Sequence, residues 1–253
     1  MKKVLNIKSK IQNYNIYSEN KFEKIFKNLP KDSIFIVDEK IYNLFLKKYL
    51  KRKIYLKIFS NEKTKDFKNL DKILKFYLKF VTKNIKIIAI GGGVVQDVVS
   101  FISSIFRRGI EWYFIPSTII SQGDSCIGGK TAINYKNIIN SLGNYYHPKT
   151  VFIYNDIIQN IPDREFKSGI PEILKCGLLK KNKILSILQE KKELILKRDY
   201  NIISQLCSET LKTKIFFFKS DIFEKNKRLL LNFGHTFAHS IEMATEELSR
   251  YEY

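Results

Sequence analysis

IKIIAIGGGVVQDVVSFISSIF, residues 85–106, is the stretch that decides the fold class: a short apolar run, three glycines and a longer apolar run at helical spacing. This order predicts a strand, a tight turn and a helix. Glycines let backbone N–H groups approach an oxyanion, and a helix N-terminus favours negative charge, so the turn is a candidate phosphate-binding site. Gln96 stands where the GxGxxG pattern has its last glycine, and a tight turn without a ligand is an equally open interpretation. Asp97 falls in the first turn of the helix, which favours a carboxylate whatever its function.

Runs of similar character on both sides of this unit predict an open α/β sheet. Helical spacing of apolar residues predicts helices over residues 40–50 and 66–81. Short β-branched and aromatic runs predict strands at residues 33–38, 53–59, 85–90, 112–115 and 151–154. Strand, helix and strand in succession indicate a parallel sheet with right-handed crossovers. From Arg164 onward the spacing is helical. We therefore expect a Rossmann-like α/β domain over residues 1–160 and an all-helical domain over residues 161–253.

The composition excludes several classes of protein. With 253 residues, of which 44% are hydrophobic, the chain is long enough for a substantial core and too apolar for a disordered protein. The longest apolar stretch, residues 87–95, is about half of a bilayer span, so we expect no membrane-spanning segment. Asn6, Lys8 and Lys10 interrupt the N-terminal run MKKVLNIKSK, which argues against a signal peptide.

Cysteine usage and charge limit the surroundings and partners of the chain. Cys126, Cys176 and Cys207 have unrelated spacings that predict no disulfide framework and no zinc knuckle, so we expect reduced thiols in the cytoplasm. The formal net charge of +20 suggests nucleic acid, yet the lysines are spread along the chain without a block of consecutive basic residues. We expect no dedicated nucleic-acid or membrane partner, and a basic non-catalytic binding protein stays as the alternative.

Three further motifs carry candidate chemistry. The polar, glycine-punctuated loop PSTIISQGDSCIGGKTAIN, residues 116–134, follows a predicted strand, where ligands gather in open α/β sheets. In LLLNFGHTFAHSIE, residues 229–242, His235 and His239 share one helix face. They suit two metal ligands, or one ligand and one substrate-binding group, or two polar residues satisfied by neighbours. Glu172 in GIPEILKCG is three residues before Lys175, which favours an ordinary helical ion pair.

Taken in order, GGGVVQD, PSTIISQGDSCIGGKTAIN, GIPEILKCG and RLLLNFGHTFAHSIE resemble the 3-dehydroquinate synthase family over nearly the whole chain. The resemblance implies an NAD-binding α/β domain followed by a helical, metal-binding domain. It implies conversion of 3-deoxy-D-arabino-heptulosonate 7-phosphate to 3-dehydroquinate and phosphate in the shikimate pathway, which supplies aromatic amino acids. Sister sugar phosphate cyclases share these features, and one of them is the alternative enzyme.

The resemblance also assigns roles to individual residues. It implies that NAD is bound by Asp38, Glu62, Lys65, Gly92, Gly93, Val94, Asp97, Ser117, Thr118, Asp124, Ser125 and Lys130. It implies zinc, or another divalent cation such as cobalt, on Glu172 and His235. Catalytic and substrate-binding roles fall to Arg108, Lys130, Asn140, Lys175, Lys214, Arg228, Asn232 and His239. Arg108 is expected to act in a neighbouring subunit, which implies a homodimer.

Three positions depart from the family pattern. Ile139 replaces a lysine, and Asn160 replaces a threonine near the cofactor. The third zinc ligand is a histidine of an HGEAV motif, which is expected just where the chain ends in SRYEY. We therefore expect an incomplete zinc site and little or no synthase activity. Glu252 is a chemically acceptable substitute ligand, but ordering a chain terminus is entropically expensive. A fragment and a naturally shortened product fit the sequence equally. The Lys214 and Arg228 pair favours a substrate that bears a carboxylate, and the substrate of the inosose-forming cyclases has none.

Overall fold

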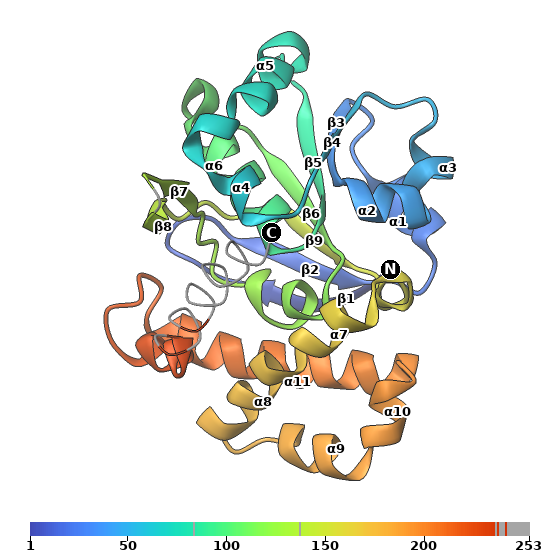
Figure 1. Cartoon of the computed structure of the whole chain (residues 1–253), viewed down its shortest axis with the longest axis vertical. Helices are drawn as coiled ribbons and strands as arrows, with labels where there is room; N and C mark the ends of the chain where they lie inside the picture. Colours follow the sequence, from blue (N-terminus) through green and yellow to red (C-terminus); the bar gives the residue numbers. More distant parts are fainter. Residues whose placement is uncertain (83, 137, 236, 238–240, 242–253) are drawn as a thin grey trace, which may run out of the picture.

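The computed structural model describes residues 1–82, 84–136, 138–235, 237 and 241. In this part of the chain a seven-stranded sheet has the order β1-β2-β9-β6-β5-β3-β4, and helices cover both of its faces (Figure 1). Its strands are β1 Lys2–Ile7, β2 Tyr14–Ser18, β3 Ser33–Asp38, β4 Tyr55–Ile58, β5 Lys86–Gly91, β6 Trp112–Pro116 and β9 Thr150–Ile153. A separate pair is formed by β7 Ile133–Tyr135 and β8 Ile138–Leu142.

The predicted parallel sheet is confirmed, with one addition at its edge. All five predicted strands are present, and each pairs in parallel with its neighbours. The hairpin of β1 and β2 was not predicted, and β1 runs antiparallel to β2. Its edge strand is largely exposed, so it lacks the apolar run that identifies the buried strands.

The helices fall into two groups along the chain. Those that accompany the sheet are α1 Phe22–Asn28, α2 Glu39–Ile41, α3 Lys47–Leu50, α4 Glu62–Lys65, α5 Asp71–Phe80 and α6 Gly93–Ile105. Those that follow the sheet are α7 Asp163–Ser168, α8 Ile170–Leu179, α9 Ile184–Glu190, α10 Lys192–Leu196 and α11 Tyr200–Ser220. The 3-10 segments are η2 Phe67–Asn69, η3 Phe106–Arg108, η5 Asn155–Asn160 and η6 Lys227–Asn232, and the π-helical segments are η1 Tyr42–Leu46 and η4 Ser121–Ser125.

Alternate residues of the central strands feed two cores. Ile34 and Ile36 of β3 belong to the core that includes residues of α5 and α6. Phe35 and Val37 belong to the core that includes residues of α1, α8 and α11. Full burial of each such side chain contributes about 1.5–3 kcal/mol, so the register of β3 between its neighbours is firmly set.

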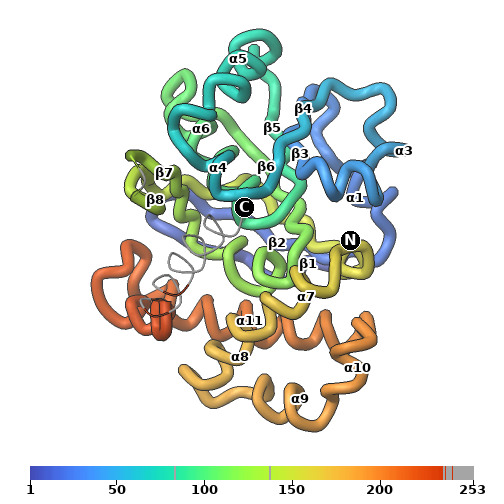
Figure 2. Tube along the Cα trace, in the orientation of Figure 1, coloured from blue at the N-terminus to red at the C-terminus, as the bar shows by residue number. Residues whose placement is uncertain are grey.

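The long helix α11 connects the sheet to the later helices. It packs against η4, which follows β6, and against α8 and α9. Figure 2 shows the chain after α11 turning back on itself, and there the Tyr145 hydroxyl donates to the carbonyl oxygen of Phe223 at 3.0 Å. This path brings the last helical segments beside the polar loop that follows β6.

Two features of the fold concern membranes and cysteine chemistry. In the described part of the chain no helix is long and apolar enough to cross a membrane. All three cysteines are buried free thiols, as their spacing predicted. Burial raises the pKa of the Cys176 thiol to about 12, which keeps it protonated and unreactive.

Candidate active site

Two cavities meet at Asp97, a residue that lines both of them and so forms their shared wall. The glycine-turn cavity has a volume of about 770 Å³ and is lined by Gly92, Gly93, Ser117 and Thr118, among others. The lysine-rich cavity has a volume of about 490 Å³ and is lined by the cations Lys130, Lys175, Lys214 and Arg228, together with four carboxylates and other residues. Asp97 lines both cavities.

The glycine turn joins β5 to α6 and leaves its last residue facing open space. Gly92 caps the helix, and a Cβ atom there would lie 2.9 Å from the Cγ2 atom of Thr118. Gly93 is different, because a Cβ atom there would meet nothing within 4 Å. Glycine is therefore required at residue 92 for packing, whereas the space at residue 93 is available to a ligand at the N-terminus of a 13-residue helix.

Ser117 supplies a second sign that the glycine-turn cavity is built for a ligand. Its backbone N–H donates to the carbonyl oxygen of Gly91 at 2.9 Å, which holds the ends of β5 and β6 together. Its hydroxyl is buried and has no hydrogen-bond partner among the described residues. Buried hydroxyls normally have partners, so this one fits a polar ligand group, and the cavity fits a dinucleotide with its phosphates at the turn.

A polar chain runs along the boundary between the two cavities. Lys65 Nζ lies 2.9 Å from Asp97 Oδ2 and donates to Asn140 Oδ1 at 2.6 Å. The backbone N–H of Asn140 donates to Asn134, whose amide donates to Glu62 Oε2 at 2.8 Å. Burial raises the pKa of Asp97 to about 6, although the ion pair with Lys65 opposes that rise.

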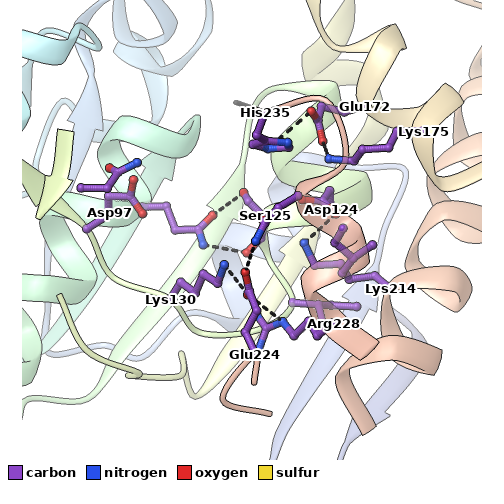
Figure 3. Close-up of a pocket in the computed structure, with 16 residues that line it drawn as sticks. Asp97, Asp124, Ser125, Lys130, Glu172, Lys175, Lys214, Glu224, Arg228 and His235 are labelled. Carbon is purple, nitrogen blue, oxygen red and sulfur yellow. Dashed lines mark hydrogen bonds and ion pairs between the residues drawn. The ribbon is translucent and has the colours of Figure 1, made fainter. Parts of the chain in front are cut away.

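Each cation of the lysine-rich cavity lies against a carboxylate (Figure 3). Lys175 pairs with Glu172 on α8, and Lys214 of α11 pairs with Asp124 of η4 at 2.7 Å. Lys130 pairs with Glu224, which lies in the segment between α11 and η6. Arg228 Nε lies 3.4 Å from the same carboxylate. These cations and their paired carboxylates therefore come from four separate parts of the chain.

The pair formed by Lys214 and Asp124 is largely enclosed. The two side chains are 11% and 16% exposed. Burial by itself would raise the pKa of Asp124, but Lys214 beside it holds that pKa below its usual range. Asp124 is therefore ionised at neutral pH, and Lys214 is held toward the cavity.

Arg228 is almost completely buried, at 1% exposed. One guanidinium nitrogen donates to the carbonyl oxygen of Ile222, and the guanidinium carbon lies 5.4 Å from the ring centre of Phe218. Gly128 has a φ of +116°, and a Cβ atom there would lie 2.1 Å from Arg228 Nη2. The glycine in the polar loop is thus required for Arg228 to reach the cavity.

Glu172 and His235 form the candidate metal site. Glu172 Oε1 lies 3.9 Å from His235 Nε2, and the other oxygen of Glu172 pairs with Lys175. Two ligands of one tetrahedral zinc lie roughly 3.4 Å apart, so the pair fits two of its ligands after a small adjustment. Within residues 1–82, 84–136, 138–235, 237 and 241, no group of three His, Cys, Asp or Glu residues could hold a metal ion. His239 and Glu252 lie outside the described residues.

The structure distributes the other predicted residues unevenly. Arg108 is exposed and lies outside both cavities, and so do Ile139 and Asn160. The glycine-turn cavity brings together nine of the predicted NAD-binding residues: Asp38, Glu62, Lys65, Gly92, Gly93, Val94, Asp97, Ser117 and Thr118. The other three, Asp124, Ser125 and Lys130, line the lysine-rich cavity with Asn140, Glu172, Lys175, Lys214, Arg228, Asn232 and His235. Their roles stay predictions.

Two polar residues that line the lysine-rich cavity, Gln96 and Glu224, are not among those predicted from the sequence. Gln96 exchanges two hydrogen bonds with Ser125, each 2.7 Å long, and so connects α6 to η4. It was noted only as a departure from a glycine pattern. Glu224 accepts hydrogen bonds from Lys130 and Asn232. No motif marks Glu224, and its partner Lys130 is distant in sequence, so the sequence carried no signal for it.

The fold is that of a known class of sugar-converting enzymes. The 2-epi-5-epi-valiolone synthase of Streptomyces hygroscopicus, solved with NAD+ and Zn2+ bound, superposes with a TM-score of 0.81 at 23% identity, covering 95% of this chain and 71% of that one. A 2-deoxy-scyllo-inosose synthase, solved with carbaglucose-6-phosphate, NAD+ and Co2+, superposes with a TM-score of 0.79 at 23% identity, covering 95% and 69%.

Sequence comparison assigns the family. Residues 55–168 match the 3-dehydroquinate synthase N-terminal family model, and residues 169–250 match the C-terminal one. The 3-dehydroquinate synthase of Dictyoglomus thermophilum is 35% identical over 246 residues, covering 94% of this chain and 69% of the relative. That of Clostridium tetani is 32% identical over 248 residues, covering 92% and 66%. The chain belongs to the 3-dehydroquinate synthase family and spans about two thirds of the length of these relatives.

Proposed function

We propose that the chain is a 3-dehydroquinate synthase, a lyase that converts 3-deoxy-D-arabino-heptulosonate 7-phosphate to 3-dehydroquinate and phosphate with NAD and a divalent metal. One observation carries the proposal: a cavity at a glycine turn and helix N-terminus shares Asp97 with a cavity that is lined by four cations. A dinucleotide in the first cavity and an anionic sugar in the second would meet at this wall.

The proposed cofactor site is the glycine-turn cavity. Gly93 leaves room for a phosphate at the start of α6, and the buried hydroxyl of Ser117 is available to the cofactor. The solved relatives with NAD+ bound support this choice of cofactor. Nine residues of the proposed NAD set line this cavity, whereas Asp124, Ser125 and Lys130 would act from the substrate side.

The proposed substrate site is the lysine-rich cavity. A sugar phosphate with a carboxylate needs cations and amide donors, and charge-assisted hydrogen bonds are the strong ones. Lys130, Asn140 and Asn232 would bind the phosphate, with His239, and Lys214 and Arg228 would bind the carboxylate. The carbaglucose-6-phosphate complex of the solved inosose synthase supports a phosphorylated sugar as the ligand class.

The residues around the metal pair would position the reacting hydroxyl group. Glu172 and His235 would hold zinc or cobalt, and the ion pair with Lys175 orients the Glu172 carboxyl group. When bound, NAD would accept a hydride from the substrate and return it, and the metal would polarise the substrate oxygen. The buried Lys65 would hold the Asp97 carboxylate in place between the two cavities.

The relatives do not favour the alternative functions. The curated relatives reported above are 3-dehydroquinate synthases, whereas the sister cyclases are similar at 23% identity, which supports the fold alone. A basic, non-catalytic binding protein would have no need of the unpartnered Ser117 hydroxyl in a cavity beside a glycine turn.

The proposal extends to organisation and location. We propose an NAD-binding domain over residues 1–160 and a metal- and substrate-binding domain over residues 161–253. We also propose a homodimer in which the exposed Arg108 enters the neighbouring site, and a cytoplasmic location. The three buried free thiols support a reducing compartment.

Phosphate release from the heptulosonate phosphate tests the proposed function. It would be measured with NAD and zinc on this chain, and on this chain joined to the part of the Dictyoglomus thermophilum relative that the match leaves out. We expect NAD-dependent release in the joined form, lost on chelation of the metal. Release that needs no NAD, or its absence in both forms, would contradict the proposal.

A substrate comparison and a matched variant sharpen this experiment. Turnover of glucose 6-phosphate in place of the heptulosonate phosphate would favour a sister cyclase. Lys214→Gln should lower kcat/KM by about a hundredfold or more, because a group that contacts the substrate carboxylate is lost. Lys212→Gln, two residues earlier on α11, removes an exposed cation and should leave kcat/KM unchanged.

A further inference from the structure

Glu224 lies where an anionic ligand would have to bind. Its side chain is 9% exposed, and its carboxylate pairs with Lys130 and lies 3.4 Å from Arg228 Nε. Its other oxygen accepts a hydrogen bond from the Asn232 amide at 2.6 Å. Two cations and an amide donor, three groups of the kind that bind an oxyanion, are thus directed at one internal carboxylate (Figure 3).

Each lysine or arginine that lines the cavity already lies within ion-pair distance of a carboxylate, although Arg228 Nε makes no hydrogen bond among the described residues. Four cations face four carboxylates, Asp97, Asp124, Glu172 and Glu224, and each of the four cations pairs with one of them. An anion that enters this arrangement meets a balanced site. Withdrawal of one carboxylate therefore gives the anion a full charge-assisted contact.

Glu224 is the carboxylate whose withdrawal disturbs the fold least. Asp97, Asp124 and Glu172 lie within α6, η4 and α8, so their backbones are held by helical hydrogen bonds. Glu224 lies between α11 and η6 with a φ of +55°, a left-handed conformation that a non-glycine residue adopts at a cost. Its release also frees two cations at once.

We propose that the Glu224 carboxylate holds the place of the substrate phosphate in the empty site and is displaced when that phosphate binds. Glu224 keeps Lys130 and Asn232, the groups assigned to the phosphate, in position until the ligand arrives. Its displacement also frees Arg228, which is assigned to the substrate carboxylate. The inference deepens the proposed function and rests on it, because the anion is the phosphate of the proposed substrate. Glu224 thereby sets the apparent affinity for that phosphate.

The expected size of the effect follows from competition. An anion that binds only the released state has its apparent affinity reduced by the fraction of molecules in that state. If about one molecule in ten is released, removal of the carboxylate tightens binding about tenfold. A residue that merely positioned Lys130 and Arg228 would have the opposite effect, since its removal would weaken binding.

The test measures the affinity of the chain for inorganic phosphate by titration calorimetry at constant ionic strength. Glu224→Gln keeps the shape and the contact with Asn232 but removes the charge, and we expect about tenfold tighter binding. Glu190→Gln, an exposed change of equal charge at the end of α9, is the matched control and should leave the affinity unchanged. Unchanged or weaker binding by Glu224→Gln would overturn the inference.

Two additions keep the outcome decisive. Glu224→Asp retains the charge but shortens the side chain, so it serves if the Gln variant does not fold, and we expect a smaller gain in affinity. Phosphate titration needs neither NAD nor turnover. Tighter phosphate binding by the Glu224 variant without turnover would support Glu224 as the displaced group and contradict the proposed reaction. Turnover with unchanged phosphate affinity would support the proposed reaction and contradict the role of Glu224.

Discussion

The glycine-turn cavity and the lysine-rich cavity select their ligands by different physical means. The first uses backbone geometry at a turn between β5 and α6, with an uncrowded Gly93 and an unpartnered Ser117 hydroxyl. The second uses charged side chains from η4, α8, α11 and the segment after α11, each already paired. Changes in the first cavity should therefore affect binding more than folding, whereas changes in the second should affect both.

The largest expected effect on stability comes from a substitution that breaks the charge balance of the lysine-rich cavity. Lys214→Met leaves Asp124 enclosed without its cation, and the free energy of unfolding in urea should fall by about 3 kcal/mol or more. The double variant Lys214→Met with Asp124→Asn should recover much of that loss, because no buried charge remains unpaired. A double variant as unstable as the single one would show that packing of Lys214, and not charge, matters.

The next effect separates the two roles of neighbouring glycines in the turn. Gly93→Val should abolish the rise in Tm caused by NAD, a stabilisation of about 2.7 kcal/mol at a hundredfold excess over Kd, and leave the unliganded Tm nearly unchanged. Gly92→Ala should instead destabilise the unliganded protein by about 1 kcal/mol, because its methyl group meets Thr118. The absence of an NAD-dependent rise in the parent chain would refute the cofactor site.

Asp97, the shared wall of the two cavities, is expected to change the stability of the protein with pH in the opposite direction to Asp124. The pKa of Asp97 is raised to about 6, so the folded state binds the proton more tightly than the unfolded state does. Stability relative to Asp97→Asn should therefore rise as the pH falls from about 7 to about 4, by at most about 1.4 kcal/mol per pH unit.

Asp124 provides the contrast in the same series of unfolding curves. Its pKa is lowered by Lys214, so its contribution is complete above the unfolded pKa near 4 and is lost as the pH falls below that value. For each variant, the measured quantity is the stability of the parent chain minus that of the variant, followed as the pH falls. If this difference changed in the same direction for Asp97→Asn and Asp124→Asn, the charge assignments would be contradicted.

The smallest expected effect concerns two serines near the end of β6. Ser117→Ala removes an unpartnered buried hydroxyl and should change the free energy of unfolding by less than about 0.5 kcal/mol while weakening NAD binding severalfold. Ser121→Ala removes a hydroxyl that is hydrogen-bonded to Thr118, and it should cost about 1 kcal/mol. Equal losses of stability would argue that Ser117 has a partner of its own in the folded chain.

Prediction from the sequence succeeded where the signal is local and failed at the margins. The strand over residues 33–38 was located without error, because its short apolar run is buried on both sides. The β1 and β2 hairpin at the sheet edge was missed, since partly exposed strands alternate too weakly to stand out. The helix predicted over residues 40–50 is present as three helical segments, α2, η1 and α3. The α-helical and π-helical segments differ in their backbone hydrogen bonds, which the spacing of apolar residues does not encode.

By itself, the sequence determined the alternation of strands and helices, the glycine turn and most residues of the candidate site, because these depend on local spacing and on motifs that are contiguous. Only the tertiary structure decided which charges meet. Asp124 faces Lys214 across 90 residues of chain, and Glu224 faces Lys130 from a segment without a motif. The physical reason is that an ion pair needs two segments brought together by packing, as α11 and η4 are for Lys214 and Asp124, and neither partner carries that information alone.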